Sequence, residues 1–139
     1  MATRDFAAIE ATLSSENPSS NQQTFLSAIQ AIGANNFTGV AQYLTDDVEL
    51  CIHGFPHMNG TWRGRVNVLA AMTMNFMKVT EQKPVIQDMV QRDNVLVLRM
   101  RESGRFVQSK IPYDVDVVFW CTFLEGKISK IEEFVHYVH

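Results

Sequence analysis

Strand periodicity dominates the second half of the chain and limits the possible folds more than any other feature. Between residues 113 and 123, one face is wholly apolar and consists of Val115, Val117, Phe119, Cys121 and Phe123. Such alternation is typical of a β-strand that packs one face against a core. Similar segments cover residues 85–91, 95–102 and 128–138, and the strand around residue 113 starts at 107 or 111 and ends at 124. Turn residues separate these segments, so we expect a meander of four strands.

Helical periodicity characterises the first half. Helices are predicted over residues 5–13 and from residue 22, where Phe25, Ile29 and Ile32 recur at helical spacing. A short helix over residues 37–44, a strand over 48–53, a loop over 54–64 and a longer helix over 65–79 follow. Helices segregated from a strand meander predict an α+β fold, in which a curved antiparallel or mixed sheet wraps around N-terminal helices.

Size and charge narrow the class of protein further. The 139 residues, 46% of them hydrophobic, predict one domain, with an N-terminal helix and polar linker over residues 1–21 and the core over 22–139. A net charge of −3 with scattered basic residues argues against nucleic-acid binding. No apolar run reaches the roughly 18–20 residues of a membrane span, and the N-terminus lacks a signal-peptide core, so we expect a cytoplasmic protein without membrane partners.

The two cysteines do not suggest a disulfide or a metal pair. Cys51 and Cys121 fall in predicted strands without the close spacing of a metal or redox motif. In a reducing compartment, buried free thiols are the expected state.

One acidic residue interrupts the apolar face of the last predicted strand. Glu133 shares that face with Ile131, Val135 and Tyr137. An unpaired buried carboxylate is costly, so Glu133 is predicted either to line a wet cavity or to form an ion pair. In a cavity, its apolar surroundings would raise its pKa and suit it to acid–base chemistry.

Arg99 is the candidate partner of Glu133, and two orientations of its strand remain open. Arg99 shares a face with Val95 and Val97, whereas Leu96, Leu98 and Met100 form the opposite face. If the arginine face is inside, an Arg99–Glu133 pair could hold an anion or a carbonyl group. If the leucine face is inside, Arg99 is solvated or lies in an interface.

Two histidines follow the first predicted strand. His53 ends that strand and His57 lies in the next loop. Histidine is the natural proton shuttle near neutral pH, so His53 is a candidate acid–base or ligand-contacting residue. A hydrogen bond at the strand end is the alternative. No third residue has the spacing of a metal ligand, and we expect no metal.

Three motifs stand in a characteristic order: Phe37-Thr-Gly-Val-Ala-Gln-Tyr-Leu-Thr-Asp-Asp47 before the first strand, Gly60-Thr-Trp-Arg-Gly64 ahead of the long helix, and Phe123-Leu-Glu-Gly-Lys-Ile128 into the last strand. From about residue 25 to 137, the chain resembles the nuclear transport factor 2-like superfamily, and within it the SnoaL-like and ketosteroid isomerase-like proteins. The resemblance implies a cystatin-like α+β fold, a cone-shaped barrel around an apolar pocket, and a homodimer formed through the outer sheet face. Trp120, between Val118 and Thr122 on the polar face of its strand, fits such an interface.

The resemblance indicates where catalytic residues would lie in this chain. At some of those positions, the chain lacks the residues that ketosteroid isomerases and epoxide hydrolases use. The ketosteroid isomerase base would fall at Ile52 or His53 and the protonated acid near Phe119, so the expected aspartates are missing. Limonene epoxide hydrolase-like enzymes activate water with an Asp-Arg-Asp arrangement. By this resemblance, Arg99 falls at the position of the arginine and Glu133 at that of one aspartate. Arg101 stands where the second acid would be.

The remaining site predictions concern the pocket wall. Trp62, between Gly60 and Gly64, is expected either to line the pocket or to pack against the start of the long helix. Tyr113 could offer a hydroxyl donor, and Met72 could form a soft part of the wall.

Together these residues predict a SnoaL-like protein that binds a small hydrophobic molecule. If it is an enzyme, we expect a cofactor-free isomerase, cyclase, dehydratase or hydrolase. Glu133 would be the base or water activator, His53 its proton-transfer partner and Arg99 the oxyanion stabiliser. The alternative is a non-catalytic ligand-binding or dimerisation module.

Overall fold

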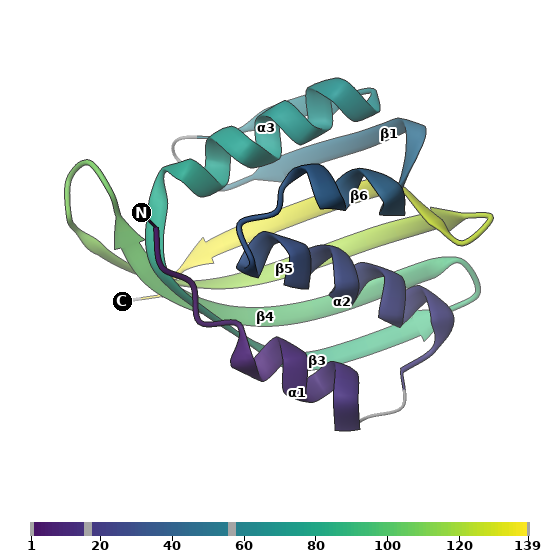
Figure 1. The fold of residues 1–139 in the computed structure, drawn as a ribbon, viewed down its shortest axis with the longest axis horizontal. Helices are drawn as coiled ribbons and strands as arrows, with labels where there is room; N and C mark the ends of the chain where they lie inside the picture. Colours follow the sequence, from purple (N-terminus) through teal and green to yellow (C-terminus); the bar gives the residue numbers. More distant parts are fainter. Residues whose placement is uncertain (1, 16–17, 56–57, 139) are drawn as a thin grey trace.

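The computed structural model describes residues 2–15, 18–55 and 58–138. The helices are α1 (Ala7–Ser15), α2 (Ser20–Gly33), the 3₁₀ helix η1 (Thr38–Tyr43) and α3 (Arg65–Met77). The strands are β1 (Leu44–His53), β2 (Gly60–Arg63), β3 (Val79–Arg92), β4 (Val95–Phe106), β5 (Pro112–Leu124) and β6 (Lys127–Tyr137). Figure 1 shows the helices on one side of a strongly curved sheet.

The six strands form one mixed sheet in the order β2-β1-β6-β5-β4-β3. Only β1 and β6 run parallel among these neighbours, and all other pairs are antiparallel. The α+β class and the curved mixed sheet with N-terminal helices are therefore confirmed. The sheet is not a closed barrel, because β2 and β3 are its two edges in the described part of the chain. It curves around the helices without closing (Figure 1).

Helix α2 is held by a complete N-terminal cap. The Ser19 hydroxyl accepts from the Gln22 backbone N–H, and the Gln22 side chain accepts from the Ser19 backbone N–H, which satisfies two otherwise unpaired donors. The helix begins at Ser20, two residues before the predicted start, because this cap lies just ahead of the apolar stripe. Phe25, Leu26 and Ile29 on that stripe are buried against the sheet.

Strands β1 to β4 differ in extent from the prediction, and β1 begins at Leu44 instead of residue 48. The loop expected over residues 54–64 contains β2, whose Gly60–Arg63 segment pairs with β1. Strand β3 begins at Val79 and includes Pro84, which an edge strand tolerates because one side of it needs no ladder hydrogen bonds.

The residues after 102, where the predicted strand ends, are instead part of β4, which continues to Phe106. Gly104 has a packing role there. A Cβ atom on Gly104 would lie 2.6 Å from the Tyr113 hydroxyl oxygen, so only glycine leaves room for that ring. The extra strand length thus positions Tyr113 beside β4.

The leucine face of β4 is the inner one. Leu96, Leu98 and Met100 are buried in the core, whereas Arg99 lies on the outer face with its guanidinium 3.7 Å from the Asp116 carboxylate. Both cysteines are free thiols, with Cys121 buried and Cys51 half-buried. Within the described residues, none of the helices combines the length and apolarity that crossing a membrane requires.

Candidate functional site

A cavity of about 80 Å³ lies between the helices and the concave face of the sheet. Its wall is mostly apolar, with contributions from α2, α3 and five of the six strands. Among the described residues, four polar side chains interrupt this wall: Asn75, Gln82, Glu102 and Glu133. Two carboxyl groups therefore face one small apolar space, which is an expensive arrangement unless one of them stays protonated.

Glu133 lines the cavity from β6. Its neighbours in the sheet are Ile52 on β1 and Phe119 on β5, and both also line the cavity. None of the described residues forms a hydrogen bond or ion pair with the Glu133 carboxyl group. Burial, together with the charge of Glu102, raises the pKa of Glu133 from 4.5 to about 8. The group is therefore mostly a neutral acid at pH 7.

Glu102 on β4 has hydrogen-bond partners, whereas the described part of the chain provides none for Glu133. Its Oε2 atom accepts from the Tyr113 hydroxyl at 2.7 Å and from Gln82 Nε2 at 3.2 Å. Burial raises the pKa of Glu102, and these two hydrogen bonds and the charge of Arg4 oppose that rise. The pKa of Tyr113 is also raised, mainly by burial and then by Glu102, so its hydroxyl remains a donor.

Asn75 on α3 adds a third type of polar group to the wall. Its Oδ1 atom is buried and has no hydrogen-bond partner among the described residues. Because an unpaired buried acceptor is costly, a ligand or water in the cavity would be stabilised by a hydrogen bond to this side chain.

The model of the SnoaL-like domain matches residues 25–131 of this sequence. The chain belongs to the SnoaL-like family.

Solved structures support the fold of this SnoaL-like chain. An NTF2-like protein of unknown function from Burkholderia pseudomallei has a TM-score of 0.75 at 18% identity, over 87% of this chain and 92% of that one. TerC, co-crystallised with polyporic acid, has a TM-score of 0.72 at 15% identity, over 83% and 90% of the two chains. A protein assigned as a SnoaL-like polyketide cyclase from Jannaschia has a TM-score of 0.69 at 16% identity, over 84% and 85%. No protein of curated function matches the sequence.

The SnoaL-like fold brings four of the predicted pocket residues to the cavity or its edge. Ile52, Met72 and Phe119 line it, and the Tyr113 hydroxyl binds Glu102. Trp62 does not line the cavity. It pairs with Leu50 across β2 and β1 and packs against the hydrophobic core.

His53 and Arg99 lie away from Glu133, so their predicted position at the cavity is corrected. Successive residues of a strand point to opposite faces of the sheet. Ile52 and Leu98 are on the inner face, so the residues that follow them, His53 and Arg99, are on the outer face. The exposed His53 ring stacks on Phe134 with 4.8 Å between ring centroids. The same ring lies 3.2 Å from Cys51 Sγ and 3.8 Å from the Glu132 carboxylate.

The described ranges contain no group of three or more His, Cys, Asp or Glu side chains that could hold a metal ion. His57 lies outside the described residues.

Sequence reasoning missed Glu102, Gln82, Asn75 and Arg4. A signal for Glu102 was present, because it continues the period-two face of Leu98 and Met100 just as Glu133 continues the face of Ile131. Gln82 and Arg4 gave no such signal. They reach Glu102 only through contacts between distant parts of the chain.

Proposed function

We propose that this SnoaL-like protein binds a compact, mostly apolar molecule that carries a carbonyl group, and that Glu133 exchanges a proton with it. One observation carries the proposal: Glu133 faces an apolar cavity without a partner among the described residues. A neutral carboxylic acid in such a place can donate a hydrogen bond to a carbonyl oxygen. Its conjugate base can accept a proton from a carbon next to that carbonyl.

The pKa of Glu133 suits both roles. An acid–base group works best when its pKa lies near the working pH, and burial raises the pKa of Glu133 to about 8. Removal of a proton from the substrate carbon by the Glu133 carboxylate would give an enolate and a protonated Glu133. Return of that proton to a different atom of the enolate completes an isomerisation. Attack of the enolate carbon on a second carbonyl, whose oxygen then takes the proton from Glu133, gives a cyclisation. Positioned acid–base groups of this kind contribute about 10²–10⁴-fold in rate.

The size of the cavity limits the ligand. Its volume of about 80 Å³ exceeds the roughly 10–15 Å³ that one water needs. It is well below the roughly 300–1,000 Å³ of pockets for drug-sized ligands. A single-ring ketone or phenol is therefore a better candidate than a steroid or a polycyclic polyketide.

Ligand binding without turnover is the second candidate. Glu102 is already hydrogen-bonded to Tyr113 and Gln82, so Glu133 is the carboxyl group left for proton exchange at this cavity. A single acid can orient a ligand without completing a reaction that needs two proton-transfer groups.

Proton exchange can be measured without knowing the natural substrate. Compact cyclic ketones would be incubated with the protein in D₂O, and loss of the α-proton signals would be followed by NMR. We expect exchange with the wild-type protein and its loss in Glu133→Gln. Glu132→Gln is the matched control, because this neighbour lies on the outer face beside His53 and Lys130. Ketone binding without exchange favours the second candidate, and absence of binding to any ring-sized ketone or phenol contradicts both.

We also propose a homodimer through the outer face of the sheet. Trp120 on β5 and Phe134 on β6 are 48% and 42% exposed on this face, and large exposed aromatics mark interaction surfaces. Sedimentation should give the mass of a dimer, and Trp120→Ser should shift it toward the monomer. A wild-type protein that sediments as a monomer at high concentration contradicts this proposal.

A further inference from the structure

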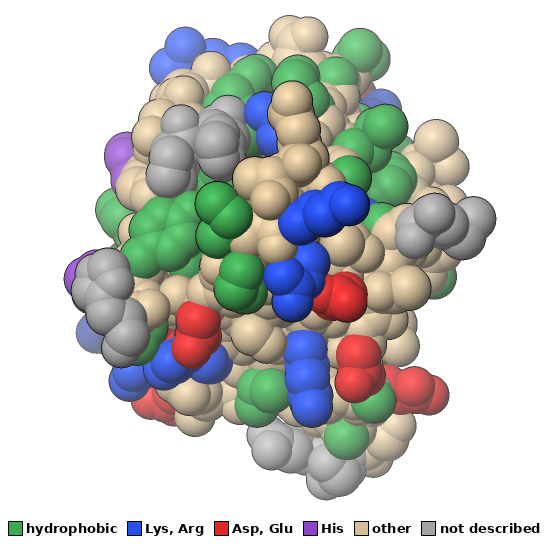
Figure 2. Space-filling model, turned by 90° about the vertical axis from the view of Figure 1, so that its left-hand side faces the viewer, with side chains coloured by type: hydrophobic (Ala, Val, Ile, Leu, Met, Phe, Trp, Pro, Cys, Tyr) green, Lys and Arg blue, Asp and Glu red, His purple; other side chains and the backbone are tan. Residues whose placement is uncertain are grey.

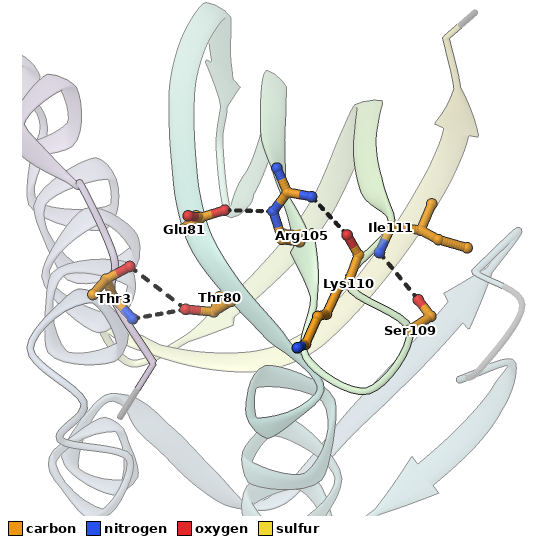
Figure 3. A network of polar contacts seen from close by, with 7 residues as sticks. All are labelled: Thr3, Thr80, Glu81, Arg105, Ser109, Lys110 and Ile111. Atoms are coloured by element: carbon orange, nitrogen blue, oxygen red, sulfur yellow. Dashed lines mark hydrogen bonds and ion pairs between the residues drawn. The ribbon is translucent and has the colours of Figure 1, made fainter.

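The residues before α1 lie along the edge strand β3 and pair with it. The Asp5 N–H donates to the Gln82 carbonyl at 2.7 Å, and the Gln82 N–H donates to the Thr3 carbonyl at 3.3 Å. The Thr3 N–H also donates to the Thr80 hydroxyl oxygen at 2.9 Å, as Figure 3 shows. With Thr3 and Asp5 fixed to β3, the residue between them is directed toward the interior.

That residue is Arg4, and each nitrogen of its guanidinium group donates a hydrogen bond. Nε donates to Asn35 Oδ1 at 2.8 Å, and Nη2 donates to the Phe76 carbonyl at 2.8 Å. Nη1 donates to Gln82 Oε1. The guanidinium carbon also lies 5.8 Å and 5.6 Å from the ring centroids of Phe37 and Phe76. A side chain with this many partners is held in one place.

Gln82 connects Arg4 to the carboxyl pair. Its side-chain oxygen accepts from Arg4 and its side-chain nitrogen donates to Glu102, and only 1% of the residue is exposed. An amide whose oxygen binds a cation is a stronger donor at its nitrogen, since hydrogen bonds in a chain polarise one another. Arg4 thus favours the charged form of Glu102 both through its field and through this bridge.

We propose that Arg4 is a positioning residue of the cavity: acting through Gln82, it keeps Glu102 as the carboxylate of the pair and leaves the proton on Glu133. This inference rests on the proposed role of Glu133. One partly buried cation balances one buried anion, so ionisation of both carboxyl groups would leave the cavity with an uncompensated negative charge.

The surrounding titratable groups agree with this assignment of the proton. Glu102 faces Arg4, Tyr113 on β5 and Glu133 on β6, and Glu133 also interacts with the Cys121 thiol on β5. Burial raises the pKa of that thiol, and the charge of Glu133 adds to the rise, so it stays neutral. Helices α2 and α3 contribute apolar side chains and the uncharged Asn75 to the cavity wall. Arg4 is therefore the cation among the described groups that act on the pair.

The test is the titration of the two carboxyl groups in the full chain, followed by side-chain ¹³C NMR with labelled glutamate. Glu102→Gln and Glu133→Gln assign the two signals. In Arg4→Met we expect the Glu102 midpoint to rise by about 1 pH unit, toward that of Glu133, because the carboxylate loses its cation. Arg4→Lys, which keeps the charge, should reverse most of that rise.

Arg105→Met is the matched control. Arg105 on β4 pairs with Thr80 near the start of β3. Its Nε atom donates to the Glu81 carboxylate at 2.8 Å and Nη1 donates to the Lys110 carbonyl at 2.6 Å (Figure 3). Neither partner belongs to the carboxyl pair. Its loss should leave both midpoints unchanged.

Unchanged midpoints in a folded Arg4→Met protein would overturn the proposal, as would equal shifts in Arg105→Met. If Arg4→Met does not fold, Gln82→Met tests the same bridge, and an unchanged Glu102 midpoint there also overturns it. The titration needs no substrate. If the midpoints do not respond to Arg4 but the protein still exchanges ketone protons, only the role of Arg4 is wrong. If the midpoints shift as expected but no ketone binds, only the proposed function is wrong.

Discussion

Glu132 and Glu133 are neighbours on β6, yet they lie in opposite environments. Glu132 is on the outer face, where it contacts His53 at 3.8 Å and Lys130 at 3.6 Å and is open to water. Glu133 is on the inner face, among apolar side chains and beside a second carboxyl group. Because the two residues share a type and a strand, the difference comes from the direction of the side chain alone.

The same contrast occurs on β4 between Arg101 and Glu102. Arg101 forms a two-point ion pair with Asp114 on the outer face, with contacts of 2.6 Å and 2.8 Å. Glu102 points inward to Tyr113 and Gln82. The outer face carries many charges that solvent and opposite charges neutralise, whereas the inner face carries few charges with large effects. Figure 2 shows how closely charges of both signs are interspersed on one side of the molecular surface.

The largest difference between the two faces should appear in packing. Leu98 on the inner face of β4 is fully buried, and Leu98→Ala should lower the free energy of unfolding by about 2–5 kcal/mol. Val97→Ala, one residue away on the outer face, should cost less than about 1 kcal/mol, because the side chain is only half-buried. Urea denaturation measures both. Equal losses would mean that the outer face is covered as well, as in a tight dimer.

A smaller effect is expected in the pH dependence of stability. Between pH 4.5 and about 8, the folded chain keeps a proton on Glu133 that the unfolded chain has released. The unfolded state therefore binds fewer protons, and stability falls as the pH rises through this window. The slope is about 1.4 kcal/mol per pH unit, or about 2 kcal/mol between about pH 6 and 7.5. Urea denaturation of Glu133→Gln should show a shallower decline than the wild type, with Glu132→Gln as the control.

The opposite sign is the result that would contradict this prediction. If the wild type instead gained stability as the pH rose toward 4.5 and stayed level above it, and Glu133→Gln removed the gain, the Glu133 carboxylate would be stabilised by the fold. In that case the pKa of Glu133 would be lowered, and its proposed role as a neutral acid would fail.

The smallest effect concerns the ion pairs of the outer face. Lys130→Met removes one of the two partners of Glu132, and both side chains of that pair are partly exposed to solvent. Surface pairs contribute about 0–1 kcal/mol and are screened by salt. Thermal unfolding at low and high NaCl should therefore differ little between Lys130→Met and the wild type. A loss as large as that of Leu98→Ala would show that this face is shielded from water.

Much of the fold could be predicted because its signals are local. Alternation in β5, the capped stripe of α2 and the turns between strands each depend on neighbouring residues. The short β2 was missed because its four residues become a strand only by pairing with β1. The extension of β4 was missed because Gly104 resembles a turn glycine in sequence, although it serves to accommodate Tyr113.

The candidate site was predictable only in part, and Glu133 and Arg99 show why. The sequence by itself determined that Glu133 shares a face with Ile131 and Val135, because side-chain alternation is a property of the extended backbone. It left open which face of β4 is inside, since both faces contain apolar residues. Packing against the helices decided that Leu98 points inward and Arg99 outward.

Only the tertiary structure decided what surrounds Glu133. Glu102 is joined to Gln82, 20 residues away in sequence, and Gln82 is joined to Arg4, 78 residues away. No periodicity links positions so distant, because their contact depends on how the N-terminal segment meets the edge of the sheet. Sequence alone identified a carboxyl group on an apolar face, and the fold gave it a second carboxyl group, a partly buried cation and a cavity.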